Sequence, residues 1–299
     1  MSCKKGGLRL TAAWGGLFKL AIVQVDELIR KAQELSPLPA SVIQLARLAG
    51  SPETDLEQIV DVMAYDQALT MRLLRAANAA TEASSNRILL ARDAVFRLGT
   101  ARILALAIAA SVQPILRQNA AGYGMGEGVL WGHSTATACA AEMLPEFTCQ
   151  EIPVESLTAA LLHDVGKLVM GRFLSPDDLD FIRRGQSEGG LNPLEAERQL
   201  LRIHHGELGG IVAQHWQLPE RIVKGIIYHH EPAAGCDRVC DVVYLANLVA
   251  KQLSAPEEQE INADNEVLER LGLTSVDLII LVNLTRDRFK TVSARYDAM

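Results

Sequence analysis

Residues 54–64 read Thr-Asp-Leu-Glu-Gln-Ile-Val-Asp-Val-Met-Ala and carry the clearest structural signal in the chain. A threonine followed three residues later by a glutamate has the arrangement of a capping box, which begins a helix. Apolar residues then recur every three or four positions, the spacing of one buried helix face: Leu56, Ile59, Val60 and Met63. The stretch therefore predicts a helix from Leu56 to about Ala64.

Helical periodicity continues on both sides of this stretch, and no segment has the alternation of a β-strand. Toward the N-terminus we expect a helix over Val23–Gln33 and another that starts near Pro39. Beyond Ala64 further helices run to Leu116, and Gly99 ends one of them. The remaining predicted helices are Val129–Met143, Val154–Leu174, Pro176–Arg184, Pro193–Gln214, Pro219–Tyr228, Asp237–Leu253, Val267–Leu271 and Ser275–Arg288. The sequence predicts an all-α fold, a multi-helical bundle.

A glycine-rich stretch, Asn119–Gly128, divides these helices into two groups. We expect two packed helical lobes, residues 23–118 and 129–290, within one domain that spans residues 23–290. Residues 1–22 are expected to form a poorly ordered leader. Within it Lys4–Lys19 contains glycines and charges and gives no continuous apolar face, so we expect that stretch to be dispensable for folding.

Composition excludes several classes of protein. The 299 residues carry 29 Lys+Arg against 36 Asp+Glu, a formal net charge of −7, which argues against general nucleic-acid binding. The longest uncharged apolar stretch, Ile103–Leu116, is shorter than the ~20 residues that cross a bilayer, so no membrane span is expected. The five cysteines include no Cys-x-x-Cys pair, and a reducing cytoplasm is the expected location.

All seven histidines lie between His133 and His230, in about a third of the chain. Within this window His163 is followed directly by Asp164. Imidazole and carboxylate are the ligands that divalent transition metals take inside helical bundles. Adjacent residues lie about 100° apart around a helix, so both side chains can reach one ion, and Asp164 could bridge two.

The histidine segments resemble the HD superfamily of metal-dependent phosphohydrolases. The pieces that carry this resemblance are residues 132–134 (GHS), 163–167 (HDVGK), His205 with Gly209 four residues later, and His229-His230. The N-terminal half adds residues 36–39 (SPLP), 66–70 (DQALT), 73–78 (LLRAAN) and 94–99 (AVFRLG). With these included, the chain resembles the HDOD domain, the HD-related output domain of bacterial signalling proteins, over roughly residues 23–288.

This resemblance implies an all-helical bundle with an HD-domain-like C-terminal lobe, a bacterial cytoplasmic setting and a role in signal transduction. It implies metal ligation by His133, His163, Asp164, His205, His229 and His230, with catalytic roles for Asp164 and Lys167. Many HDOD domains lack the metal-binding residues, whereas this chain retains them. HD phosphohydrolases close the site with a late aspartate, and here the matching residue is Asn247, a weaker and uncharged ligand. The Gly-Tyr-Pro that follows in the HD-GYP cyclic di-GMP phosphodiesterases is absent, which disfavours that activity.

Three functions stay open on this reading. The favoured one is a signalling output protein whose HD-type site binds one or two divalent transition-metal ions (Fe, Mn, Ni, Zn or Co), with or without turnover. The second is an active metal-dependent phosphohydrolase or phosphodiesterase. The third is a metal-free helical scaffold for a protein partner. A signalling protein or a phosphorylated small molecule is the expected partner.

Some of these residues have simpler interpretations. His215 lies outside every family segment and is expected to be a hydrogen-bonded packing residue, while His204 is expected at the surface or behind the ligands. Lys167 either binds phosphate or faces solvent. For His163-Asp164 the alternative is a buried hydrogen-bonded pair. Trp131 and Trp216 are expected in the core.

Overall fold

The computed structural model describes residues 25–51, 53–64, 66–80, 88–118, 125–187, 190–254 and 261–297. Throughout these residues the regular elements are helices and no β-strand is present, so the predicted all-α class is confirmed. The predicted leader, residues 1–22, lies outside the described residues, as do residues 119–124 of the predicted boundary.

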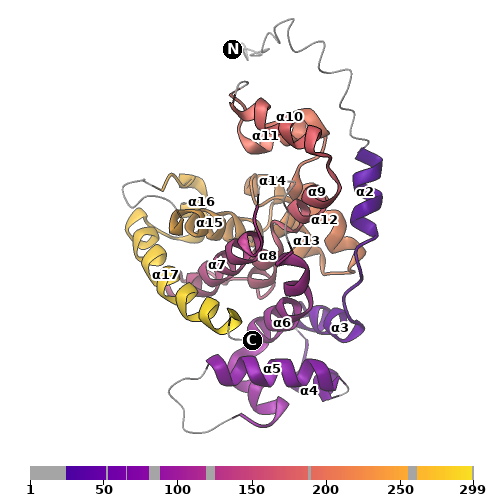
Figure 1. Cartoon of the computed structure of the whole chain (residues 1–299). Coiled ribbons are helices and arrows are strands. Elements are labelled where there is room, and N and C mark those ends of the chain that lie inside the picture. Colours follow the sequence, from indigo (N-terminus) through magenta and orange to yellow (C-terminus); the bar gives the residue numbers. More distant parts are fainter. Residues whose placement is uncertain are drawn as a thin grey trace, which may run out of the picture.

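The N-terminal helices are α2 (Val25–Gln33), α3 (Ala40–Ala49), α4 (Leu56–Ala64), α5 (Gln67–Ala80) and α6 (Ala91–Leu116). Helices α3 to α6 pack on one another and form one end of the molecule (Figure 1). Helix α2 instead packs against α9 (Val165–Phe173) and α12 (His205–His215), which lie much later in the sequence. The first helix of the domain therefore supports the histidine-bearing half.

Helix α4 has the predicted bounds but a different cap. The Asp55 side chain accepts a hydrogen bond from the Glu57 amide, and the Gln58 side chain accepts one from the Asp55 amide. The Thr54 hydroxyl instead donates to the carbonyl of Leu48 at 2.7 Å. The reciprocal cap exists, but it is one residue later than the sequence pattern indicated.

Helix α6 is the longest apolar helix in the described part of the chain. By length and composition it could cross a membrane. Gly99 adopts φ 75° and ψ 166°, so α6 is two helices joined by a kink. Its buried residues pack against α3, α4, α5 and α8 (Ser156–Leu162), which is the environment of a core helix. The absence of a membrane span stays a prediction.

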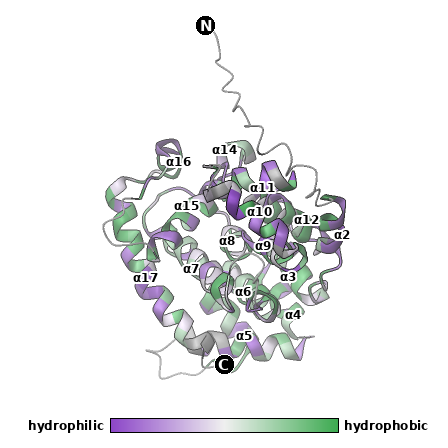
Figure 2. Ribbon diagram, turned by 45° about the horizontal axis from the view of Figure 1, so that its top comes forward, coloured by the Kyte–Doolittle hydropathy of each residue, from purple (hydrophilic) through white to green (hydrophobic). Residues whose placement is uncertain are grey.

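The remaining helices carry the histidines or surround them. They are α7 (Val129–Met143), α8, α9, α10 (Pro176–Ser187), α11 (Pro193–Leu201), α12, α13 (Glu220–Ile227), α14 (Pro232–Gly235), α15 (Arg238–Leu253), α16 (Asn265–Leu271) and α17 (Ser275–Asp297). Helix α7 packs against α8, α15 and α17, and α13 packs against α8, α12 and α15. Apolar residues line the inner faces of these helices (Figure 2).

Two predicted helices are each divided into two. The segment predicted as one helix over Val154–Leu174 breaks at His163-Asp164, where Asp164 adopts φ −99° and ψ 9°. The segment predicted as Pro193–Gln214 breaks after α11, because Arg202 adopts the left-handed conformation. His163 and Asp164 are therefore not successive positions of one continuous helix, and the 100° separation expected for them is wrong.

One continuous hydrophobic core joins the N-terminal and C-terminal helices. Trp216 is fully buried, and its indole N–H donates to the carbonyl of Ser36 at 3.0 Å. His215 Nε2 lies 3.1 Å from the carbonyl oxygen of Leu35. Both interactions tie α12 to the segment before α3. The predicted packing role of His215 is confirmed, as is the core position of Trp131 and Trp216.

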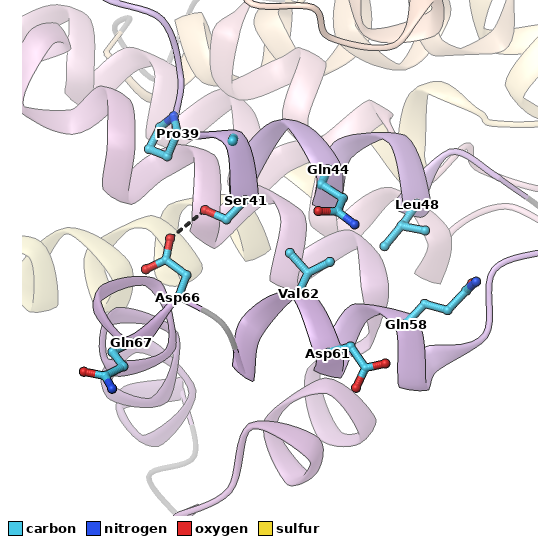
Figure 3. Close-up of a pocket in the computed structure, with 10 residues that line it drawn as sticks. Pro39, Ser41, Gln44, Leu48, Gln58, Asp61, Val62, Asp66 and Gln67 are labelled. Carbon is cyan, nitrogen blue, oxygen red and sulfur yellow. Dashed lines mark hydrogen bonds between the residues drawn. The ribbon is translucent and has the colours of Figure 1, made fainter.

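A polar groove of about 850 Å³ lies among α3, α4 and α5 (Figure 3). Glutamine side chains from all three helices line it, namely Gln44, Gln58 and Gln67. Ser41 donates a hydrogen bond to Asp66 across its edge at 2.6 Å. This contact joins the start of α3 to the start of α5.

Candidate metal centre

Six of the predicted site residues converge at the centre of the C-terminal lobe. They form two groups, with Asp164 as a member of the first. The His133 group contains His133, His163 and Asp164, and the His205 group contains His205, His229 and His230. Within each group the ligand atoms all lie within 4.8 Å of one another. The groups are assembled from α7, the α8–α9 junction, the first residue of α12 and the turn after α13.

Backbone carbonyls fix the protonation of two histidines. His163 Nδ1 lies 2.8 Å from the carbonyl oxygen of Ala160, and His229 Nδ1 lies 2.7 Å from that of Ile226. A carbonyl oxygen only accepts hydrogen bonds, so each Nδ1 carries the proton and donates it. Each Nε2 therefore presents a lone pair to the cluster, as a metal ligand requires.

A buried carboxylate has the same effect on His205. Glu197 on α11 is fully buried, and its Oε2 lies 2.7 Å from His205 Nδ1. The same oxygen accepts the backbone N–H of His205 at 2.7 Å. A carboxylate that accepts from Nδ1 leaves Nε2 as a lone pair on the inner side, an arrangement common behind metal-binding histidines.

Asp164 lies between the two groups with one oxygen toward each. Its Oδ1 is 3.3 Å from His205 Nε2 and 3.8 Å from His229 Nε2. Its Oδ2 is 3.4 Å from His163 Nε2 and 3.6 Å from His133 Nε2. Oδ1 is buried and accepts no hydrogen bond from any described residue. Buried acceptors without a donor are rare and costly, so we infer that this oxygen is suited to bind a cation.

Lone pairs therefore face one another inside the cluster. His205 Nε2 and His229 Nε2 are 3.3 Å apart, although neither atom has a proton to share. Such a contact is repulsive unless a cation lies between the atoms. The donor set consists of two sets of histidine side chains on either side of one carboxylate. Such a set fits one or two divalent transition-metal ions.

Burial keeps these histidines neutral. Desolvation lowers the pKa of His133 to about 4 and lowers the pKa of His205, His229 and His230 further below the usual range. Burial acts to raise the pKa of Asp164, but the neighbouring His163 and Lys167 outweigh it and hold that pKa well below its usual value. Neutral imidazole and ionised carboxylate are the forms that bind metals.

The two other predicted site residues also reach the cluster. Lys167 on α9 donates to Asp164 Oδ2 at 2.7 Å. Asn247 on α15 is nearly buried, and its Oδ1 lies 3.1 Å from His133 Nε2. Asn247 thus faces the His133 group at the position where the HD superfamily has an aspartate. The roles of these residues as metal ligands or catalysts stay predictions.

Close contact between α9 and α12 brings the two halves of the cluster together. A Cβ atom at Gly166 would overlap the carbonyl of His205 and would lie 2.8 Å from the amide nitrogen of Gly209. Only glycine at position 166 permits this approach. The glycines of the two sequence motifs therefore place Asp164 beside His205.

A cavity of about 570 Å³ opens onto the cluster. Lys167, His205 and His230 form its inner end, and Lys251 from α15 lies at its side. The outer wall comes from α10 and α11, which lie together at one end of the molecule (Figure 1). The cluster is therefore accessible through this cavity to a ligand of small-molecule size.

Sequence analysis missed Glu197 and Lys251 and placed His204 only approximately. Glu197 has apolar neighbours three and four residues away, Leu194 and Leu201, so its position on the buried face of α11 was visible as a charge in an apolar stripe. Lys251 follows Asn247 by one helical turn. His204 is buried, and its Nδ1 accepts the Gly206 amide as the cap of α12, which excludes the surface position and leaves the position behind the ligands.

Comparison with known proteins gives the family. The HDOD domain matches residues 35–232 of this chain. An uncharacterized protein of Treponema pallidum (strain Nichols) is 26% identical over 201 residues. That alignment covers 67% of this chain but 38% of the relative, so the chain spans less than half of that protein.

Three solved structures share the fold. An HDOD domain protein of unknown function from Geobacter sulfurreducens superposes with a TM-score of 0.66 at 22% identity, covering 89% of this chain and 96% of that one. A candidate phosphohydrolase from Shewanella amazonensis SB2B gives 0.65 at 22% identity, with coverage of 88% and 97%. A candidate signal transduction protein from Marinobacter aquaeolei VT8 gives 0.68 at 22% identity, with coverage of 88% and 59%. At these identities the likeness establishes the fold, and together with the match over residues 35–232 it means that this chain belongs to the HDOD domain family.

Proposed function

We propose that this protein is a bacterial, cytoplasmic signal-transduction output protein whose HD-type centre binds divalent transition metal and, through it, a phosphorylated ligand. The observation that carries the proposal is the pair of facing Nε2 lone pairs of His205 and His229, 3.3 Å apart beside an Asp164 oxygen without a donor. A metal-free scaffold has no reason to bury this arrangement.

Each group has a defined part in the proposal. His205, His229, His230 and Asp164 Oδ1 hold one ion, while His133, His163, Asp164 Oδ2 and Asn247 hold a second, weaker one. When bound, the metal supplies a Lewis acid that polarises a phosphoryl oxygen and lowers the pKa of coordinated water. Fe, Mn, Ni, Zn and Co are all compatible with this donor set.

The protein's own residues orient the ligand. The Lys167 ammonium lies at the inner end of the cavity and is held at Asp164, where it can donate to a phosphoryl oxygen. Glu197 and the carbonyls of Ala160 and Ile226 hold three imidazole rings in one tautomer and orientation. The outer wall from α10 and α11 limits access of bulk water.

A metal-dependent phosphohydrolase is the second candidate, and the position of Asp164 favours it. One carboxylate with an oxygen toward each of two ligand groups is suited to a two-ion site, which can stabilise both the attacking and the leaving oxygen of a phosphoester. Asn247 argues the other way, because a neutral amide weakens the His133 group.

Metal analysis tests the main proposal. The protein purified from metal-supplemented medium should contain at least one transition-metal ion per chain, and His229→Ala should lose most of it. His215→Gln is the matched control, since this histidine bonds to Leu35 away from the cluster and its replacement should leave the metal content unchanged. A wild type that stays metal-free under these conditions would favour the scaffold function instead.

Turnover separates the two metal-dependent functions. The loaded protein is incubated with bis-p-nitrophenyl phosphate and with nucleotides in the presence of Mn²⁺ or Fe²⁺. Absence of hydrolysis with metal-dependent binding of phosphate supports the output-protein function. Hydrolysis that disappears in His229→Ala supports the enzyme.

A further inference from the structure

The cavity above the metal centre is much larger than a phosphate group needs. Its volume of about 570 Å³ lies within the roughly 300–1,000 Å³ of small-molecule sites. Only its inner end touches the cluster, through His205, His230 and Lys167. The rest of the cavity therefore has to accommodate another part of the ligand.

Positive charge lines this remaining part. Lys251 on α15 and Arg183 on α10 both contribute to the cavity wall, and neither forms an ion pair or hydrogen bond with a residue that the structure describes. Lys167, in contrast, is paired with Asp164. Two cations on different helices thus line the cavity, and no described residue holds either of them in a direct ion pair.

Lys251 is exposed at the cavity and lies near the charges of the cluster. Burial lowers its pKa, the carboxylate of Asp164 raises it in part, and the charge of Lys167 lowers it again. In turn, the charge of Lys251 contributes to the lowered pKa of both His133 and His230. An ammonium in this position gains stability when an anion enters the cavity.

The wall between the charged positions is apolar. Leu179 and Ile182 of α10 are buried and line the cavity together with Met125. Pro193 and Leu194 complete this wall. A ligand bound here can pack a hydrophobic or flat part against these residues while its anionic groups meet the cations of the cavity.

We propose that Lys251 and Arg183 form a second anion subsite, so that this cavity takes an organic phosphate that carries two separate anionic groups and a flat or apolar part. The proposal rests on the proposed function, because the first anionic group is the one bound at the metal centre beside Lys167. Lys251 and Arg183 select the ligand and do not touch the reacting phosphate.

Binding measurements by isothermal titration calorimetry test this subsite. The probes are inorganic phosphate, adenosine 5′-monophosphate and adenosine 3′,5′-bisphosphate, each titrated into the purified full-length protein. The wild type should bind the bisphosphate at least tenfold more tightly than the monophosphate. Lys251→Met and Arg183→Met should each weaken bisphosphate binding about tenfold and change monophosphate binding less than twofold.

Controls separate the subsite from the metal centre. Lys290→Met removes an exposed lysine of α17 that pairs with Asp287, and it should change neither affinity. Metal content of Lys251→Met should equal that of the wild type. Equal weakening of both nucleotides in Lys251→Met, or equal affinity for both in the wild type, would overturn the subsite. Loss of metal-dependent phosphate binding would overturn the proposed function, and the bisphosphate-to-monophosphate ratio measured in EDTA would still decide the subsite.

Discussion

At Gly166 a single missing side chain allows the backbones of α9 and α12 to touch. Because a Cβ there would overlap the His205 carbonyl, Gly166→Ala must push the two helices apart. We expect a loss of about 1–3 kcal/mol in the free energy of unfolding, as for other overpacked sites, and reduced metal content. Chemical denaturation and elemental analysis measure the two effects.

Gly132 on α7 provides the matched control for this substitution. A Cβ at Gly132 meets no atom within 4 Å, so Gly132→Ala should be neutral or stabilising by up to about 1 kcal/mol. If both alanine variants behaved alike, the contact between α9 and α12 would not control the site.

Asn247 is the residue at which this chain departs from the HD metal-enzyme pattern. Its Oδ1 lies 3.1 Å from His133 Nε2, so an aspartate there would place a charged oxygen in the His133 group. We expect Asn247→Asp to raise metal affinity by about 1–3 kcal/mol, measured by competition with a chelator. Asn283→Asp, an exposed change on α17, should have no effect. Unchanged affinity in Asn247→Asp would mean that the His133 group binds no metal.

Glu197 holds His205 from behind and should control metal affinity without contacting the ion. Glu197→Gln keeps the volume but loses the charge that accepts from His205 Nδ1. Loss of such a partner typically lowers metal affinity about 10–100-fold, which chelator competition would measure. Glu195→Gln is the control on the same helix, because glutamine also serves in the capping box that Glu195 completes with Asn192. Equal effects of the two changes would count against this role for Glu197.

For individual residues, the sequence predicts the site residues that belong to motifs but not the site residues that lie outside them. His133, His163, Asp164, His205, His229, His230 and Asn247 were all expected at one centre, and they meet there. Glu197 and Lys251 act on the cluster from elements outside the motifs. Their importance depends on tertiary contact, which spacing along one chain does not show.

At the scale of elements, the positions of helices were predictable and their breaks were not. Periodicity continues through His163-Asp164 and through Arg202, because apolar residues on both sides keep the helical spacing. The breaks come from packing. Asp164 adopts non-helical dihedral angles at the point where its two oxygens lie toward different histidines. Helix α12 begins at His205, whose backbone N–H donates a hydrogen bond to Glu197.

The start of α5 offers a test of stability at this scale. Asp66 accepts the Leu69 amide at 2.9 Å and the Ser41 hydroxyl at 2.6 Å (Figure 3), and these hydrogen bonds lower its pKa. Asp66→Ala should cost about 1 kcal/mol at neutral pH, measured by chemical denaturation. Because the pKa is lowered in the folded state, the contribution of Asp66 is present above about pH 4 and is lost as the pH falls further.

Asp61, on the same groove, serves as the control for Asp66. Its side chain is exposed on α4 (Figure 3), so Asp61→Ala should change stability by less than about 0.5 kcal/mol at any of these pH values. A pH-independent difference between wild type and Asp66→Ala would show that the carboxylate is not the stabilising group.

For the whole molecule, the candidate metal centre connects parts of the chain that are far apart in sequence. Its residues come from α7, the α8–α9 junction, α12, the turn after α13 and α15, and α2 packs behind α9 and α12. The lobe that holds the cluster shares one core with the N-terminal helices. A ligand bound to the cluster therefore stabilises contacts that exist only in the folded chain.

Removal of metal should accordingly lower the stability of the entire fold. An ion present at about a thousand times its Kd contributes roughly 4 kcal/mol, because it binds the folded state and not the separated ligands. For a chain of this size we expect Tm to fall by about 10 °C on treatment with a chelator, measured by differential scanning calorimetry, and to recover when metal is restored. His229→Ala should start from the lower Tm and respond little to chelator, whereas His215→Gln should respond like the wild type. A wild-type Tm unaffected by complete metal removal would mean that the facing lone pairs of His205 and His229 are tolerated without an ion, and the metal centre would have to be abandoned.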